Sequence, residues 1–188
     1  MSMRIVVLGA PGAGKGTQAA RISDHFGTPT ISTGELFRSH IAAGDELGQL
    51  AAGYIDQGNL VPDDVTTLMV ADRLSRDDVA GGFILDGFPR TLAQAAALDR
   101  ILGDRPLDGV VDFEVQIDAV IGRMLRRAVE QGRSDDTEDV IRNRIRVYHE
   151  KTAPLAAHYR ERGLLISVDA MGEIDEVASR VVDALEHI

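Results

Sequence analysis

Residues 9–17, near the N-terminus, have the types and spacing that bind phosphate groups. Their sequence, GAPGAGKGT, contains the pattern G-x-x-x-x-G-K. In this pattern the glycines let successive backbone N–H groups converge on phosphate oxygens, and the start of the following helix adds partial positive charge behind them. Lys15 supplies a mobile positive charge for the β- and γ-phosphates. The segment therefore predicts a loop that holds the phosphates of a nucleotide.

A glycine-rich turn that only joins a strand to a helix is the alternative interpretation of this loop. The apolar run at residues 5–8, the helical pattern from Gln18 onward and the lysine in its expected place favour phosphate binding. One departure is that Gly16 follows Lys15, and the hydroxyl comes one position later, at Thr17. This spacing argues against the usual direct contact between such a hydroxyl and Mg²⁺.

A carboxylate follows a second apolar run. Asp86 comes directly after residues 83–85, Phe-Ile-Leu, and would lie at the carboxyl edge of a sheet, where open α/β sheets bind ligands. Such a carboxylate is suited to holding Mg²⁺ through water, because Mg²⁺ keeps much of its hydration shell. An aspartate before glycine is otherwise typical of a helix cap or turn. Its position after a buried strand favours the metal.

Arginines are concentrated in one short span of an otherwise acidic chain. Guanidinium groups bind phosphate in a bidentate manner, so the span is a candidate for contacts to a phosphate group in transfer. The alternative is a solvated helix with ion pairs four residues apart. The arginines of this span are Arg123, Arg126, Arg127, Arg133, Arg142, Arg144 and Arg146.

Strand and helix patterns alternate along the chain. Short apolar runs are typical of strands buried on both faces. They occur at residues 5–8 and 83–85, at Val110-Val111 with Phe113 and Val115, and at Leu164-Leu165-Ile166 with Val168. Strands that alternate with helices predict an α/β fold with a mostly parallel sheet. Apolar residues three or four apart predict helices over residues 18–26, 62–74, 92–102, 119–129, 139–159 and 174–185.

Two segments interrupt this alternation. Residues 32–61 are helical in pattern and interrupted by glycines, which predicts an inserted helical lobe. Residues 126–136 are polar and charged, which predicts a short mobile flap. The chain has no internal repeats or linkers, so residues 1–188 are expected to form one domain. Its core would comprise residues 1–31, 62–125 and 137–188.

The composition excludes several classes of protein. Hydrophobic residues make up 44% of the chain and charged residues 27%, which is ordinary for a soluble globular protein. The formal net charge of -10 argues against broad nucleic-acid binding. The absence of cysteine excludes disulfides and cysteine-bound zinc. The N-terminus lacks the features of a signal peptide and no apolar run is long enough to span a membrane, so we expect a cytoplasmic protein.

Several blocks together resemble the adenylate kinase family across essentially the whole chain. They are the loop at residues 9–17, Ser32-Thr33-Gly34-Glu35-Leu36, Asp86-Gly87-Phe88-Pro89-Arg90 and Gln94, in family order. The flap resembles that of short-lid members, which lack the extra zinc-binding domain. The resemblance implies a fold of the P-loop NTPase type, with a five-stranded parallel sheet flanked by helices, a nucleoside monophosphate (NMP)-binding lobe and a short lid. It also implies a monomer.

The activity that the resemblance implies is reversible transfer of the γ-phosphoryl group of ATP to AMP, giving two ADP, with Mg²⁺ and without structural zinc. The expected ATP-binding residues are Gly12, Ala13, Gly14, Lys15, Gly16, Thr17, Arg127 and Gly172. The expected AMP-binding residues are Thr33, Arg38, Asn59, Leu60, Val61, Gly87, Phe88, Pro89, Arg90, Gln94, Arg133 and Arg144. The expected catalytic residues are Lys15, Arg90, Arg133 and Arg144.

Taken singly, some of these assignments have plain structural alternatives. Thr33 is compatible with a helix cap, Gln94 with a surface residue and Gly172 with a loop glycine. Their chemistry nevertheless fits the assigned roles: the amide of Gln94 offers donors and an acceptor to an adenine edge, and Arg38 and Arg90 suit a phosphate. No general base is needed, because the attacking phosphate is already an anion, so no histidine is given a role.

Two rival functions remain open at this stage. A UMP/CMP kinase would have the same fold and similar motifs, and Thr33 favours AMP, since a small apolar residue is expected there in that sister family. A nucleotide-dependent regulator would need only one nucleotide pocket, and the residues Arg38, Arg90 and Gln94 argue against it.

Overall fold

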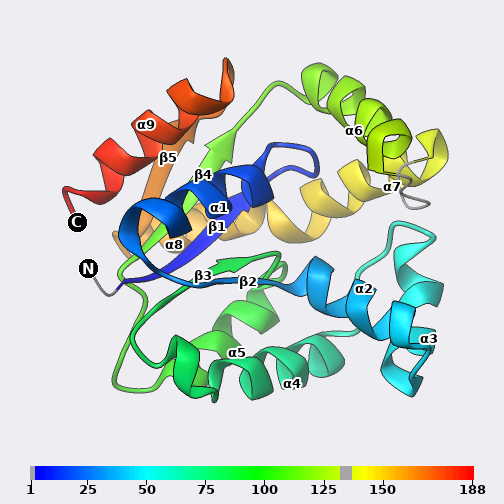
Figure 1. Ribbon diagram of the computed structural model, residues 1–188, viewed down its shortest axis with the longest axis horizontal. Coiled ribbons are helices and arrows are strands. Elements are labelled where there is room, and N and C mark those ends of the chain that lie inside the picture. The colour runs from blue at the N-terminus through cyan, green and yellow to red at the C-terminus, as the bar shows by residue number, and fades with distance from the viewer. Residues whose placement is uncertain (1–2, 132–136) are drawn as a thin grey trace.

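A five-stranded parallel sheet forms the centre of the molecule. In a computed structural model, which describes residues 3–131 and 137–188 apart from the side chains of Arg127 and Gln131, the strand order is β2-β3-β1-β4-β5. Every neighbouring pair is parallel, so all five strands end at one edge, as Figure 1 shows. The strands are β1 (Arg4–Gly9), β2 (Thr30–Ser32), β3 (Phe83–Asp86), β4 (Gly109–Glu114) and β5 (Leu165–Asp169).

The expected fold class is confirmed, and four of the strands coincide with the predicted apolar runs. The fifth, β2, was expected only from the family resemblance. It has three residues, and only Ile31 in it is both apolar and buried, so it gives no periodic signal.

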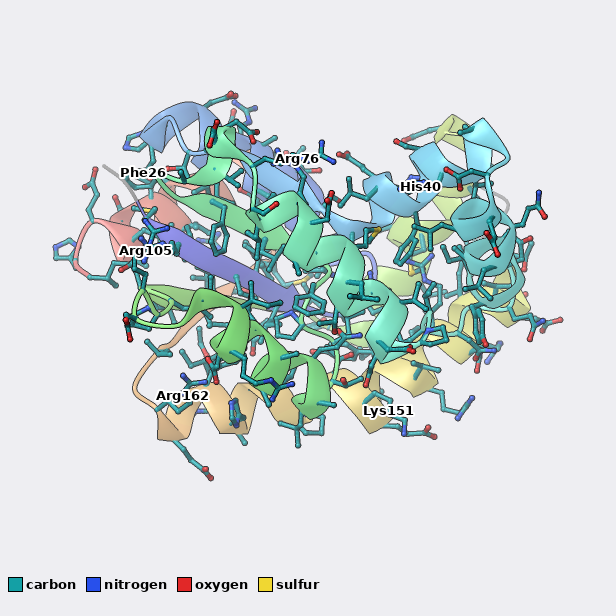
Figure 2. All side chains as sticks on the ribbon, turned by 90° about the horizontal axis from the view of Figure 1, so that it is seen from below. Phe26, His40, Arg76, Arg105, Lys151 and Arg162 are labelled. Atoms are coloured by element: carbon teal, nitrogen blue, oxygen red, sulfur yellow. The ribbon has the colours of Figure 1, made fainter. Side chains whose placement is uncertain are left out.

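Helices cover both faces of the sheet. Strand β1 illustrates the cause, since alternate side chains on a strand point to opposite faces: Ile5 and Val7 belong to one buried cluster and Val6 and Leu8 to the other. Helices α1 (Lys15–Phe26) and α9 (Ile174–Leu185) complete the first cluster. In Figure 2, α4 and α5 cross in front of β1 on the opposite face. The second cluster is completed by α4 (Asp63–Leu74), α5 (Leu92–Leu102), α8 (Pro154–Glu161) and the short 3-10 turn η1 (Asp77–Val79).

Two further helices project at the end of the molecule where the strands terminate (Figure 1). Helix α2 (Thr33–Ala43) begins after Ser32, whose hydroxyl accepts a hydrogen bond from the Glu35 N–H. Helix α3 (Glu46–Ile55) begins after Asp45, whose carboxylate accepts from the Gly48 N–H at 2.8 Å. These caps satisfy N–H groups that have no partner inside the helix. The predicted helical character of residues 32–61 is therefore present as a pair of helices, which pack with α4 around Phe37, Ala51 and Val61.

A helical arm lies beside them at the same end. Helix α6 (Ile117–Gln131) continues through the first part of the segment that was predicted as a flap, and residues 132–136 of that segment lie outside the described residues. The predicted single helix at 139–159 is wrong in detail: α7 (Glu138–Val147) passes into a π-turn, η3 (Tyr148–Thr152), before α8 begins. Pro154 explains the change, because it has no N–H and its ring clashes with the carbonyl four residues earlier.

The contact between α2 and α3 yields a stability prediction. A Cβ on Gly48 would lie 2.2 Å from the His40 carbonyl oxygen, so we expect Gly48→Ala to lower the free energy of unfolding by about 1–3 kcal/mol. Gly53, on the same helix, would meet no described atom within 4 Å. Gly53→Ala should raise the free energy of unfolding by about 0.5–1 kcal/mol, because alanine is the better helix former. Urea denaturation of both variants tests this, and equal shifts would contradict the predicted clash.

Candidate active site

A cleft of about 630 Å³ opens at the carboxyl edge of the sheet. Parallel pairing places the end of β1 beside the end of β3, since Val7 lies opposite Asp86. The lining of the cleft includes Glu35 and Arg38 of α2 and, from the α6–α7 arm, Arg123, Arg126 and Arg144. Figure 1 shows these helices at the end of the molecule where the strands terminate. Among the residues that line it are Lys15, Arg38, Asp86, Arg90, Arg144 and Gly172.

The glycine-rich loop has the backbone shape that its sequence predicts. Gly12 and Gly14 have φ angles of +77° and +93°, in the left-handed region that favours glycine. A Cβ on Gly12 would lie 2.7 Å from Met124 Cγ, so the loop also packs closely against α6. The side chain of Ala13 is buried in the core, so this residue presents its backbone to the loop. Gly14 precedes α1, so the N-terminus of that helix faces the loop, as phosphate binding requires.

Lys15 lies over the loop. Its Nζ donates hydrogen bonds of 2.9 Å to the carbonyl oxygens of both Gly9 and Ala10. These bonds hold the ammonium group at the mouth of the loop. A triphosphate there would meet a positive charge that is already in position.

Asp86 and the residues after it form the floor of the cleft. The Oδ2 of Asp86 lies 3.6 Å from the place that a Cβ on Gly16 would occupy, which puts the carboxylate against the start of α1. Gly87 has a φ of +85°, and a Cβ there would lie 2.4 Å from Thr33 Oγ1. The close approach of α2 to this turn therefore requires glycine.

Arg90 is held by the same turn. Its Nε donates to the Gly87 carbonyl at 2.9 Å. Pro89 lines the cleft, whereas the Phe88 side chain is fully buried between the sheet and its helices. Phe88 can thus reach a ligand only through its backbone.

A smaller pocket of about 80 Å³ adjoins the cleft. Its apolar lining includes Phe37, Ile55 and Val61, and its polar lining includes Gln94. This composition suits a flat base with a polar edge. The residues expected on the AMP side that line this pocket are Thr33, Arg38, Asn59, Leu60, Val61, Gly87, Arg90, Gln94 and Arg144.

Gln94 is buried and held at both ends of its amide. Its Oε1 accepts from the Arg90 backbone N–H at 2.7 Å, and its Nε2 donates to Asp63 Oδ1 at 2.7 Å. Sequence analysis missed Asp63, because an aspartate after Pro62 is typical of a helix start and gives no sign of a partner 31 residues away.

Helix α7 is fastened to the loop that carries Asn59. The Nδ2 of Asn143 donates to the Gln57 carbonyl at 2.6 Å and to Asn59 Oδ1 at 2.9 Å. A Cβ on Gly58 would lie 2.8 Å from the Val140 carbonyl oxygen, so the two segments touch closely. Arg144 follows Asn143 and lines both cavities. Sequence analysis assigned nothing to Asn143, which has no motif around it.

The described arginines of the arginine-rich span include an exposed pair and a pair that lines the cleft. Arg142 and Arg146 are exposed and pair with glutamates four residues away, as expected of surface residues. Arg123 and Arg126 line the cleft without having been assigned a role, and Arg123 Nη2 lies 3.5 Å from the carbonyl oxygen of Ala170. The predicted Arg133 and the side chain of the predicted Arg127 lie outside the described residues.

The donor atoms at the cleft suit a magnesium ion that is held partly by water and substrate. They do not suit a metal that is bound by protein side chains alone. Mg²⁺ is usually held by one or two carboxylates together with water and substrate phosphates, and Asp86 beside the phosphate loop offers such a ligand. In the described part of the chain, no three His, Asp or Glu side chains gather as a metal site. Among the same residues, no helix has the length and apolar character of a membrane span.

The carboxyl of Asp112, on β4, is partly buried. Burial raises the pKa of Asp112, and the negative charge of Glu114 raises it further, while Arg160 and Lys15 act in the opposite direction. Burial also raises the pKa of Tyr148 to about 12, with a contribution from the charge of Asp112. No motif in the sequence points to this group.

Comparison with known proteins gives a consistent result. The family model described as "Adenylate kinase" matches residues 7–164. The adenylate kinase of Kocuria rhizophila is 55% identical over 185 residues, which cover 97% of this chain and 98% of the relative. That of Nocardia farcinica is 55% identical over 185 residues, with 97% and 99% covered. That of Thermobifida fusca is 50% identical over 186 residues, with 98% of each chain covered.

The raised pKa of Asp112 predicts a pH-dependent gain in stability when the carboxyl is removed. Below about 3.8, the ordinary pKa of aspartate, the carboxyl is protonated in both the folded and the unfolded chain and has no effect. Above the folded-state pKa, the ionised group destabilises the fold. Asp112→Asn should therefore be more stable than the wild type at neutral pH, and the difference should vanish in acid.

Urea denaturation of Asp112→Asn and the wild type, from acid to neutral pH, measures the difference in their free energies of unfolding. Glu161→Gln, at an exposed position at the end of α8, removes one charge without relieving burial. This control should show no such pH-dependent gain. A less stable Asp112→Asn at neutral pH would contradict the prediction.

Proposed function

The chain belongs to the adenylate kinase family, and we propose that it catalyses the reversible transfer of the γ-phosphoryl group of ATP to AMP, giving two ADP. One observation carries this proposal beyond the family name. A phosphate loop and a second, base-sized pocket with arginines at its mouth open into the same cleft. A protein that only bound one nucleotide would not need the second pocket.

The donor side is the phosphate loop with Lys15, and ATP is the nucleotide assigned to it. Its phosphates would accept from the backbone N–H groups of residues 12–17 and from the lysine. Gly172, which lines the cleft beside α9, would lie along the adenine. We add Arg123 and Arg126 to this side because both line the cleft. Arg127, expected here from the family, retains that assignment.

Asp86 would hold the magnesium ion through water. When bound, Mg²⁺ would supply positive charge that neutralises the charge of the phosphates. The position of Asp86 against the start of α1 supports this role, since the β- and γ-phosphates of a nucleotide in the loop would lie nearby.

The acceptor side is the smaller pocket. Arg38, Arg90 and Arg144 all line both cavities. This supports the proposal that their guanidinium groups would bind the AMP phosphate beside the donor. Thr33, Gly87 and the segment 59–61 would surround the nucleoside, with Phe88 and Pro89 shaping the turn. Gln94 would meet the adenine edge.

Transfer on this arrangement needs alignment and charge, with no proton abstraction by the protein. The phosphoryl group passes through a loose transition state whose charge is spread over its oxygens. Lys15, Arg90 and Arg144, with the predicted Arg133, would stabilise that charge. The AMP phosphate attacks as an anion, which is why the cleft needs no base.

We infer that residues 32–61 act as an NMP-binding lobe and residues 126–136 as a short lid on a core of residues 1–31, 62–125 and 137–188. Their closure would exclude water, the competing acceptor. Solution scattering should show compaction when a bisubstrate analogue binds, and unchanged dimensions would overturn this division. The resemblance to the family also supports a monomer that works in the cytoplasm.

The acceptor specificity is the first test of the proposal. With Mg²⁺-ATP as donor, a coupled assay of ADP formation should show strong preference for AMP over CMP, UMP, dTMP and water. The reason is that, in the proposed site, the amide of Gln94 would meet the base. Preference for CMP or UMP would keep the mechanism but identify a different acceptor. Hydrolysis of ATP without transfer to any nucleotide would contradict the proposed kinase activity.

Lys15→Met tests the donor site. Removal of one preorganised cationic donor is expected to lower kcat by about 100- to 1,000-fold, with little change in the thermal melting temperature. Lys151→Met is a matched control, because Lys151 is exposed on η3 and Figure 2 shows it at the outer surface. A Lys15→Met variant with wild-type kcat would contradict the assigned role.

A further inference from the structure

The side-chain amide of a glutamine can read a purine in two opposite ways. Adenine presents an N–H donor at N6 and an acceptor at N1, whereas hypoxanthine and guanine present an acceptor at O6 and a donor at N1. An amide with its oxygen toward the 6-position and its nitrogen toward N1 suits adenine. The same amide turned by 180° suits the other two bases, since it exchanges donor and acceptor. Base selectivity therefore depends on what prevents the amide from turning.

Both ends of the Gln94 amide are fixed by partners whose chemistry is unambiguous. The carboxylate of Asp63 can only accept, so the group at 2.7 Å from its Oδ1 must be the Gln94 Nε2. The Arg90 backbone N–H can only donate, so the group at 2.7 Å from it must be Gln94 Oε1. A turned amide would bring oxygen against carboxylate and N–H against N–H. The orientation thus follows from the network itself.

Asp63 is in turn held in place. Its second oxygen, Oδ2, accepts from Thr91 Oγ1 at 2.9 Å, and Thr91 Oγ1 accepts from the Gln94 backbone N–H at 3.1 Å. The three residues form a closed ring between the starts of α4 and α5. The carboxylate therefore has a fixed plane and a fixed distance from Gln94.

Gln94 retains bonding capacity toward the pocket that it lines. The Nε2 carries two hydrogens and gives one to Asp63, while Oε1 has two lone pairs and uses one for Arg90. One donor and one acceptor remain. Gln94 is 2% exposed, so water cannot readily replace a mismatched base as a partner.

We propose that Asp63 is a specificity-determining positioning residue: by fixing the amide of Gln94, it makes the acceptor pocket select adenine over hypoxanthine and guanine. The proposal rests on the proposed function, in which the base of AMP lies against Gln94. Asp63 acts through Gln94 and contacts neither the phosphates nor the reacting atoms.

The test compares AMP with IMP as phosphoryl acceptors for two variants of the enzyme. Each variant has one substitution in the first turn of α4. Asp63→Asn keeps the shape of the side chain but can offer either an oxygen or an NH₂ group to Gln94, so only the Arg90 backbone N–H still opposes turning of the amide. Asp64→Asn removes the same charge from the same first turn of α4 at an exposed position, and serves as the control. Steady-state kcat and KM are measured for AMP, IMP and ATP.

For Asp63→Asn, the ratio of kcat/KM for AMP to that for IMP should fall roughly tenfold, the effect of one hydrogen bond to a charged group. The change should appear in KM for the two acceptors, while kcat with AMP and KM for ATP stay near the wild-type values. Asp64→Asn should keep the wild-type ratio. A merely structural role for Asp63 would lower activity with both acceptors together and leave the ratio unchanged.

An Asp63→Asn enzyme with the wild-type ratio would overturn the proposal, as would a wild-type enzyme that uses IMP as well as AMP. Asp63→Ser, which keeps a residue tolerated at a helix start, repeats the test if the asparagine variant does not fold. A wild-type protein with no transfer to AMP would instead reject the proposed function. The two failures are thus distinguishable.

Discussion

The parallel pairing of β1 with β3 determines where chemistry can occur in this protein. Because Val7 lies opposite Asp86, the turn after β1 and the turn after β3 leave the sheet side by side. The first turn is the phosphate loop and the second carries the carboxylate and Arg90. Left-handed glycines are needed at both turns, at Gly12 and at Gly87, since a side chain there would strike α6 or Thr33. The register of two strands thus brings an anion site and its cations to one cleft.

The acceptor pocket depends on contacts between segments that are distant in sequence. Asp63 reaches Gln94 across 31 residues, and Asn143 reaches Asn59 across 84. The first contact fixes the amide of Gln94 in the smaller pocket, and the second ties the helical arm to the loop that lines the same pocket. Arg144 lies next to Asn143 and lines both cavities. One helix therefore both lines the smaller pocket, through Arg144, and is fastened to the loop beside it, through Asn143.

Features that are encoded by contiguous residues were predictable from the sequence, and features that depend on distant contacts were not. Residues 5–8 and 83–85 are continuous apolar runs, so their strands were predictable, and the phosphate loop and Asp86 are contiguous with them. Strand β2 and the π-turn at Tyr148–Thr152 were not found by pattern, because a three-residue strand has no period and a π-turn preserves helical spacing approximately. Asp63 and Asn143 were missed for a different reason: each is defined by a tertiary contact, and no local pattern encodes its partner.

The distribution of charge explains how an acidic protein can bind two polyanions. The chain carries a formal net charge of -10, so its surface as a whole repels nucleotides. Among the described residues, however, six basic side chains and three acidic ones line the large cleft, which reverses the sign of the local field. Walls of low dielectric strengthen that field, and its effect is confined to the cleft by screening over about 8–10 Å in physiological salt. The acidic exterior therefore disfavours binding of nucleotides elsewhere on the protein, and the cleft is the place where two phosphate groups can approach each other.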